Sequence, residues 1–181
     1  FALGIKESNP NAKVYVTWIN SWYDPAKAKE AAESLIAQGV DTLAFTEDST
    51  ATVEVGQDYT KKGKQIYTFS HYSPMLKYGE DSVVSGQLVN WGIAYEEILM
   101  RLYTNTWISK DYLYFLKEGG CELGGDFGVP INPKFENDLK NKKIKDKLLG
   151  EISIYDLVMK RIEQFKDPVA KYNPFVGPLY D

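Results

Sequence analysis

The amino-acid sequence predicts an α/β fold, in which a predominantly parallel sheet carries helices on both faces. The first observation is a strand, helix and strand pattern within residues 13–45, which is the arrangement that joins two parallel strands. The second is its repetition, because apolar segments at 65–69 and 82–88 alternate with helical segments. The third is the length of 181 residues, which suits one domain.

The first unit consists of a strand, a turn and a helix. Residues 14–19 form an apolar run too short for a helix and rich in β-branched and aromatic side chains, which predicts a buried strand. Asp24 and Pro25 supply an N-cap carboxylate and a proline at the first helical position. Apolar residues then repeat at helical spacing up to Gly39, which predicts the end of the helix. The apolar run 40–45 is the second predicted strand.

Two further units follow in the same order. Asp48 or Ser49 can cap a helix that continues to Lys62, and residues 65–69 are the third predicted strand. A fourth strand at 82–89 leads through Asn90 into a helix with one apolar face. That face carries Trp91, Ala94, Tyr95, Ile98, Leu99 and Leu102.

The remainder of the chain is less regular. We expect short edge strands at 112–116 and 121–123, and a polar helix from 132 towards 149. Ser153 with Asp156 resembles a capping pair for a last helix. The helix-like segment 1–7 has no capping residue before it, and 174–181 resembles a strand entering a turn, so we expect a fragment of a larger protein.

The composition argues against several functional classes. A net charge of −4 gives no support for a nucleic-acid partner, since binding to phosphates requires a basic surface. One cysteine and one histidine form neither an intramolecular disulfide nor a zinc site of nitrogen and sulfur ligands. No apolar run reaches the roughly eighteen residues that a membrane-spanning helix needs. We therefore expect no metal, no cofactor and no membrane span in this chain.

Catalytic motifs are absent as well. The sequence has no GxSxG elbow, P-loop, GxGxxG or HExxH pattern. The one combination that resembles a hydrolytic triad is Ser49, His71 and Asp48. We expect no enzymatic activity, and a small α/β hydrolase using His71 is an alternative hypothesis.

Polar and aromatic residues follow each predicted strand, at 20–22, 47–49, 70–72 and 89–91. The carboxyl ends of parallel strands lie along one edge of a sheet, where open α/β folds bind ligands. An indole offers a stacking surface and the polar groups offer directional hydrogen bonds, which suits a planar heterocycle. The candidate ligand-binding residues are Ser21, Trp22, Asp48, Ser49, His71, Tyr72 and Asn90.

These residues also have purely structural interpretations. Trp22 can be a packing residue, and Asp24 is better explained as a helix cap than as a ligand contact. Ser49 and Asn90 are helix caps first and ligand contacts second. A lone histidine is more often a structural hydrogen-bonding group than a base. Trp91 fits the apolar face of its helix, so we expect it in the core.

Several motifs resemble the basic membrane lipoprotein family of substrate-binding proteins, which includes purine-nucleoside receptors. They are NSWYDPAKAKEAAESLIAQGVDTLAFTEDST at 20–50, KGKQIYTFSHYS at 62–73, VNWGIAYEEIL at 89–99, NTW at 105–107 and FVGPLYD at 175–181. The resemblance covers nearly the whole chain. It implies that residues 1–181 are one α/β lobe, mainly the C-terminal one, of a two-lobed type I periplasmic-binding-protein fold.

The same resemblance implies a function. The full-length protein would be the substrate-binding component of an ABC importer, an extracytoplasmic lipoprotein that binds a small molecule between its lobes and delivers it to a permease. Trp22 matches the residue that stacks on the base in nucleoside-binding relatives. Tyr72 and Val89 stand where those relatives hold the ribose with a carboxylate and a lysine. The implied ligand is therefore a purine nucleoside, a nucleobase or a similar flat molecule.

A regulatory ligand-sensing domain of the same fold is a further alternative. The two functions differ in what precedes Phe1 in the full-length protein. A signal peptide with a lipid-attachment cysteine indicates import, whereas a helix-turn-helix module indicates regulation.

Overall fold

The computed structural model describes residues 1–167 and 169. They divide into two compact units. The first, which we call the sheet unit, is Trp18–Phe135; the second, the terminal unit, combines Phe1–Thr17 with the described part of Glu136–Asp181. The strand and turn predicted at 174–181 lie outside the described residues. The assignment of the chain to a single lobe stays a prediction.

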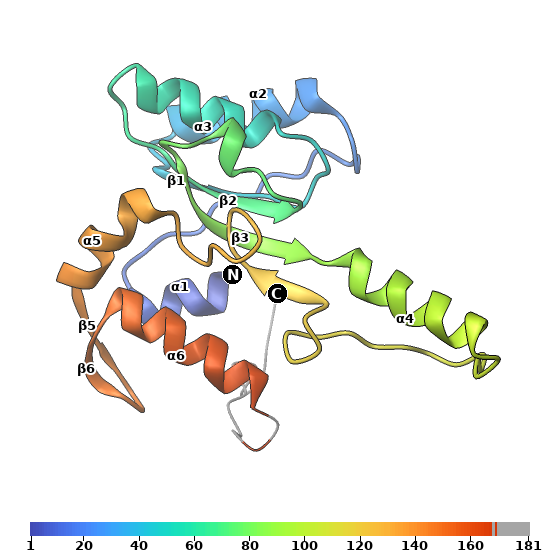
Figure 1. The fold of residues 1–181 in the computed structure, drawn as a ribbon. Coiled ribbons are helices and arrows are strands. Elements are labelled where there is room, and N and C mark those ends of the chain that lie inside the picture. Colours follow the sequence, from blue (N-terminus) through green and yellow to red (C-terminus); the bar gives the residue numbers. More distant parts are fainter. Residues whose placement is uncertain (168, 170–181) are drawn as a thin grey trace. The chain divides into compact units, whose positions relative to one another are not determined.

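The sheet unit is built on a four-stranded sheet in the order β1-β2-β3-β4 (Figure 1). Its strands are β1 (Thr42–Ala44), β2 (Tyr67–Tyr72), β3 (Val83–Val89) and β4 (Cys121–Leu123). β1 pairs with β2 and β2 with β3 in parallel, whereas β3 and β4 are antiparallel. The predicted α/β class with a mainly parallel sheet is confirmed.

Two helices of this unit form as their end signals predict. In α2 (Pro25–Ala37) the Asp24 carboxylate accepts a hydrogen bond from the Lys27 backbone N–H at 3.1 Å. Gly39 follows with φ of 92°, a conformation that glycine adopts without steric cost. α3 (Ala51–Lys61) connects β1 to β2 and shares a buried cluster with α2 and the strands. That cluster comprises Ala32, Ile36, Leu43, Val55 and Ile66.

The strand predicted at 13–19 is wrong. Residues 12–19 form no regular element, and Val16 and Trp18 expose 69% and 82% of their surface. Among the described residues, none donates or accepts a backbone hydrogen bond with 13–19. A run of β-branched and aromatic residues becomes a strand only when a neighbouring strand takes its backbone groups. The first parallel crossover in the structure is therefore β1-α3-β2.

The other two long elements differ from prediction in extent and burial. β2 continues three residues beyond the predicted 65–69, so Ser70, His71 and Tyr72 belong to the strand. α4 (Trp91–Tyr103) forms as predicted, but none of its residues is buried. The expected core position of Trp91 is therefore wrong, since 54% of its surface is exposed and its ring stacks on Tyr95. Of the apolar face of α4, Tyr95, Leu99 and Leu102 are also more than half exposed, whereas Ala94 and Ile98 are partly buried.

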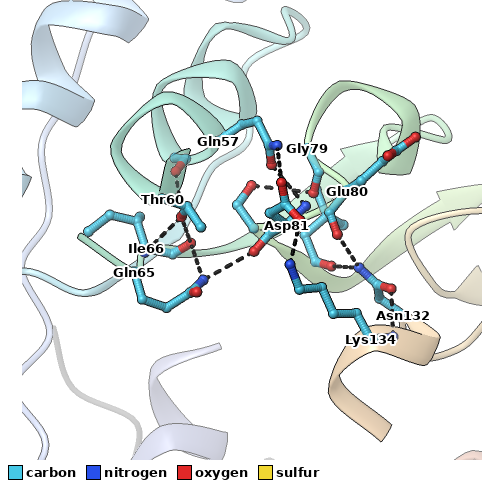
Figure 2. Close-up of polar contacts among 12 residues, drawn as sticks. Gln57, Thr60, Gln65, Ile66, Gly79, Glu80, Asp81, Asn132 and Lys134 are labelled. Carbon is cyan, nitrogen blue, oxygen red and sulfur yellow. Dashed lines mark hydrogen bonds and ion pairs between the residues drawn. The ribbon is translucent and has the colours of Figure 1, made fainter. Parts of the chain in front are cut away.

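A polar network holds the starts of β2 and β3 together (Figure 2). Gln57 on α3 donates to the Asp81 carboxylate at 2.8 Å and accepts from the Asp81 backbone N–H at 2.9 Å. Lys134 forms an ion pair with the same carboxylate, and Gln65 donates to the Asp81 carbonyl at 3.1 Å. Since Gln65 and Asp81 precede β2 and β3, these bonds fix where the two strands begin.

The terminal unit contains α1 (Ala2–Ser8), the hairpin of β5 (Lys143–Asp146) and β6 (Gly150–Ser153), and α6 (Ile154–Lys166). The Ser153 hydroxyl accepts from the Asp156 backbone N–H at 3.0 Å, which confirms the capping pair. The polar helix α5 (Pro133–Asn141) ends eight residues before the predicted 149, because Asp146 organises a hairpin turn. Its buried carboxylate accepts from the backbone N–H groups of Leu148 and Leu149. The short strand predicted at 112–116 does not form.

Candidate functional site

The predicted site residues lie on four segments of the sheet unit. One segment is the turn before α2, and the other three are the carboxyl ends of β1, β2 and β3. The turn and the loop after β1 are joined directly, because the Asp48 backbone N–H donates to the Trp22 carbonyl at 2.8 Å. This bond anchors the backbone of Trp22 at the sheet edge that the sequence predicts.

The turn before α2 presents an indole to solvent. Asn20 adopts a positive φ of 52°, which reverses the chain direction. The Ser21 hydroxyl then accepts from the Tyr23 N–H at 3.3 Å and donates to the Tyr23 carbonyl at 3.1 Å. The hydroxyl of Ser21 is thus occupied in shaping the turn. Trp22, between them, exposes 78% of its surface.

The loop after β1 contains a buried carboxylate that the sequence interpretation passed over. Glu47 accepts from the Ser49 backbone N–H at 2.9 Å and from the Ser49 hydroxyl at 2.8 Å. The same hydroxyl accepts from the Ala51 N–H at 3.2 Å, at the first turn of α3. The Ser49 hydroxyl therefore supports the helix start, but the N-cap position is Thr50, one residue after the predicted cap at Asp48 or Ser49. Asp48, between the two buried residues, is exposed.

His71 lies near the end of β2 with only 5% of its surface exposed. Its Nδ1 is 2.6 Å from Gln87 Nε2 on β3, and its ring packs edge-on against Phe45 and Tyr72. Burial lowers the pKa of His71 below its usual value, partly opposed by the nearby carboxylates of Asp48 and Glu47. Burial therefore favours the neutral form of the His71 imidazole.

The ends of β2 and β3 contribute one aromatic and one amide side chain. Tyr72 has a positive φ of 64° and exposes 43% of its surface, so its ring is accessible where the strand turns away. Asn90 occupies the N-cap position of α4, but its side chain accepts no hydrogen bond from the helix. The predicted side-chain cap is therefore wrong. The Asn90 backbone N–H donates to the Gly120 carbonyl at 2.9 Å.

Most of the predicted residues are connected. Trp22 and Asp48 share a backbone hydrogen bond, Asp48 and His71 interact electrostatically, and His71 contacts Tyr72. Asn90 follows the neighbouring strand and forms no hydrogen bond to these four among the described residues. Gln87 was missed by sequence reasoning. The available signal was a polar residue in β3 at the position paired with His71.

The arrangement favours binding over hydrolysis. The Ser49 hydroxyl donates to Glu47 and not to His71, so this structure does not form the serine–histidine pair that a triad needs. Within residues 1–167 and 169, no group of three metal-ligating side chains converges and no helix is long and apolar enough to cross a bilayer. What the site offers is an exposed indole and phenol, a carboxylate, an amide and an imidazole.

The chain is similar to substrate-binding proteins of ABC transporters. A family model described as "ABC transporter substrate-binding protein PnrA-like" matches residues 1–158. A purine-binding protein of Brucella abortus is 30% identical over 179 residues, which are 99% of this chain and 43% of that protein. A putative ABC transporter glucose-binding protein of Haloferax volcanii is 29% identical over 141 residues, covering 78% of this chain and 34% of that protein.

A solved structure agrees at the level of the fold. A solute-binding protein of an ABC transporter from Conexibacter woesei aligns with a TM-score of 0.58 at 18% identity, covering 90% of this chain and 47% of that one. The chain therefore spans less than half the length of each of these three proteins. The resemblance to the basic membrane lipoprotein family is confirmed, and the chain belongs to the PnrA-like family of ABC transporter substrate-binding proteins.

Proposed function

We propose that the full-length protein binds a purine nucleoside, a nucleobase or a similar flat molecule for an ABC importer. The ligand lies between two lobes, against the strand ends of the sheet unit. The binding residues are Ser21, Trp22, Asp48, Ser49, His71, Tyr72 and Asn90. The protein presents this ligand to a membrane permease outside the cytoplasm, where a lipid anchor holds it.

One observation carries the proposal: a tryptophan in a rigid polar turn, with most of its surface exposed. An exposed indole forgoes the favourable free energy of burying its large apolar surface. A small polar residue in the same turn would lose nothing of this kind. The turn holding Trp22 is braced by the Ser21 and Asp48 hydrogen bonds, so the ring is presented by a fixed backbone. A flat heterocycle that stacks on this ring regains the burial.

The chemistry around the ring suits a base in particular. Asp48 and Asn90 accept hydrogen bonds from exocyclic amino groups or ring N–H groups, and Asn90 and Tyr72 also donate. The similarity to a purine-binding protein supports this ligand class. The similarity to a protein named as glucose-binding makes glucose the appropriate contrasting ligand.

The test compares two exposed tryptophans in the full-length protein. Trp22→Ala should weaken binding of adenosine or adenine by about 5- to 150-fold, which corresponds to the loss of about 1–3 kcal/mol of stacking. Trp18→Ala is the matched control, because Trp18 is equally exposed but precedes the turn. It should leave the dissociation constant unchanged in calorimetry. Glucose should produce no binding heat.

The outcome also separates stacking from packing. If Trp22 stacks on a ligand, its removal should leave the melting temperature nearly unchanged. A buried tryptophan would instead cost about 3–5 kcal/mol of unfolding free energy. A variant that melts far earlier, while its folded fraction still binds adenosine normally, would refute the assignment. Mass spectrometry of ligand released from the purified full-length protein would identify the natural ligand.

A further inference from the structure

His71 and Gln87 meet across the ladder between β2 and β3. The register pairs the two residues, and Gln87 Nε2 lies 2.6 Å from His71 Nδ1. An amide nitrogen donates hydrogen bonds and does not accept them, so the imidazole Nδ1 is the acceptor. A neutral imidazole whose Nδ1 accepts carries its proton on Nε2. The contact therefore selects one of the two tautomers.

The surroundings of His71 keep the ring neutral and fixed. Its side chain is almost fully buried and packs edge-on against Phe45 on one side and Tyr72 on the other, with ring centroids 6.2 Å and 4.6 Å away. Burial lowers its pKa despite the carboxylates of Asp48 and Glu47. The ring is therefore packed against two aromatic neighbours, and its burial favours the neutral form.

The Nε2–H group remains available. Among the described residues no side chain or backbone group hydrogen-bonds to His71 Nε2, and this atom is not among the completely buried polar atoms that lack a partner. The ring borders Tyr72 and lies in the field of Asp48, both of which belong to the candidate site. The Nε2–H donor therefore lies within electrostatic range of a carboxylate acceptor.

We propose that Gln87 is a positioning residue that fixes His71 as the neutral Nε2–H tautomer, so that His71 donates a hydrogen bond to an acceptor atom of the ligand. The role as a ligand donor rests on the proposed function, whereas the tautomer does not. The acceptor is a ring nitrogen or carbonyl oxygen of a neutral heterocycle. Together with the Asp48 carboxylate, this donor selects ligands that carry both an acceptor and an N–H group on one edge, as purine bases do.

The tautomer can be measured directly, because His71 is the only histidine in the chain. Selective 15N labelling of histidine in this 181-residue chain gives one pair of imidazole resonances. The wild-type spectrum at neutral pH should show a protonated Nε2 and an unprotonated Nδ1. Protonation on Nδ1 in the wild-type chain would mean that the Gln87 amide is turned the other way, which overturns the proposal before any variant is made.

Two substitutions test the role of Gln87. Gln87→Glu replaces the amide donor by a carboxylate that only accepts, so the proton should move to Nδ1 and the apparent pKa of His71 should rise. Gln87→Leu should leave a mixture of both tautomers. Gln38→Leu, on the exposed end of α2, is the control and should keep the wild-type spectrum. An unchanged spectrum in folded Gln87→Glu refutes the positioning role.

Adding adenosine to a sample labelled with 15N on both histidine and tryptophan tests the ligand contact. Millimolar adenosine should shift the Nε2–H resonance, since NMR detects weak binding. If adenosine perturbs the Trp22 indole resonance and leaves Nε2–H unmoved, His71 is not the donor and that part of the inference is wrong. If adenosine perturbs neither and the full-length protein also gives no binding heat with adenosine, the proposed purine function fails, while the tautomer measurement still decides the role of Gln87.

Discussion

At the scale of single residues, Asp24 shows how a local signal positions the site. Its carboxylate accepts from the Lys27 backbone N–H at 3.1 Å, and the Lys27 ammonium lies 3.2 Å from the same group. These contacts cap α2, which begins three residues after Trp22, so they fix where the turn ends. The Asp24 cap therefore helps to fix the position of Trp22 in the preceding turn.

The pH dependence of stability should report on this cap. The Lys27 N–H, followed by its ammonium, holds the pKa of Asp24 below its usual value. A carboxyl with a lowered folded-state pKa stabilises the fold above its unfolded pKa of about 4, and this contribution is lost as the pH falls through the folded value. The melting temperature of Asp24→Asn should therefore lie below wild type at pH 7, and the gap should narrow as the pH falls below about 4.

Glu30→Gln provides the control for a change of charge on the same helix. Glu30 is exposed, and its side chain forms no hydrogen bond or ion pair among the described residues. This variant should melt like wild type across the pH range. A gap for Asp24→Asn that stays constant from pH 7 to pH 3 would contradict a role for the charged carboxylate.

At the scale of elements, the close approach of β2 and β3 sets the register that pairs His71 with Gln87. Gly86 lies opposite Ser70, and a Cβ atom at Gly86 would come within 2.0 Å of the Ser70 hydroxyl and 2.6 Å of its carbonyl oxygen. The Ser70 hydroxyl also donates to the Gly124 carbonyl at 3.2 Å. The absence of a side chain at Gly86 therefore lets a buried serine fit between two strands and the segment after β4.

Gly86→Ala should destabilise the sheet by about 1–3 kcal/mol, as overpacking of a filled interior does. Because Ser70 and Gly86 adjoin the His71–Gln87 pair, the substitution should also weaken ligand binding by the full-length protein. Urea unfolding and calorimetry measure the two effects.

Gly4→Ala is the matched control for that substitution. Gly4 lies in α1 and a Cβ atom there meets nothing within 4 Å, so alanine should stabilise this helix by about 0.5–1 kcal/mol. Equal effects of the two substitutions, or a neutral Gly86→Ala, would show that the β2–β3 contact is not tight.

At the scale of the whole molecule, the candidate site is open in the sheet unit. Trp22 and Tyr72 are both exposed. The Brucella abortus and Haloferax volcanii relatives are each more than twice as long as this chain. Small-molecule sites normally bury about 70–90% of the ligand surface. One exposed indole with a few polar groups buries far less, so we propose that a second lobe supplies the other wall.

The isolated chain should therefore bind adenosine more weakly than micromolar, whereas the full-length protein should bind it at least tenfold more tightly. Titration calorimetry of both proteins, in the same buffer and at the same temperature, measures the difference. The Trp22→Ala variant of the full-length protein serves as the reference for lost stacking. Micromolar or tighter binding by residues 1–181 alone would contradict the two-lobed proposal.

The sequence by itself determined the elements whose signals are local. Asp24, Pro25 and Gly39 mark the ends of α2, and Ser153 with Asp156 begins α6, because caps and special φ values act within a few residues. Apolar runs located β1, β2 and β3, and from them the sheet edge where the candidate residues lie. The motifs that resemble the basic membrane lipoprotein family also identified the family without any coordinates.

Only the tertiary structure decided which groups find partners. The run 14–19 has the composition of a strand and yet pairs with none of the described strands, and most of the apolar face of α4 stays exposed. Conversely, the sequence does not show that Ser49 bonds to the buried Glu47 or that the register brings Gln87 to His71. The physical reason is that hydrogen bonding and burial depend on neighbours distant in the chain, and strand register places those neighbours.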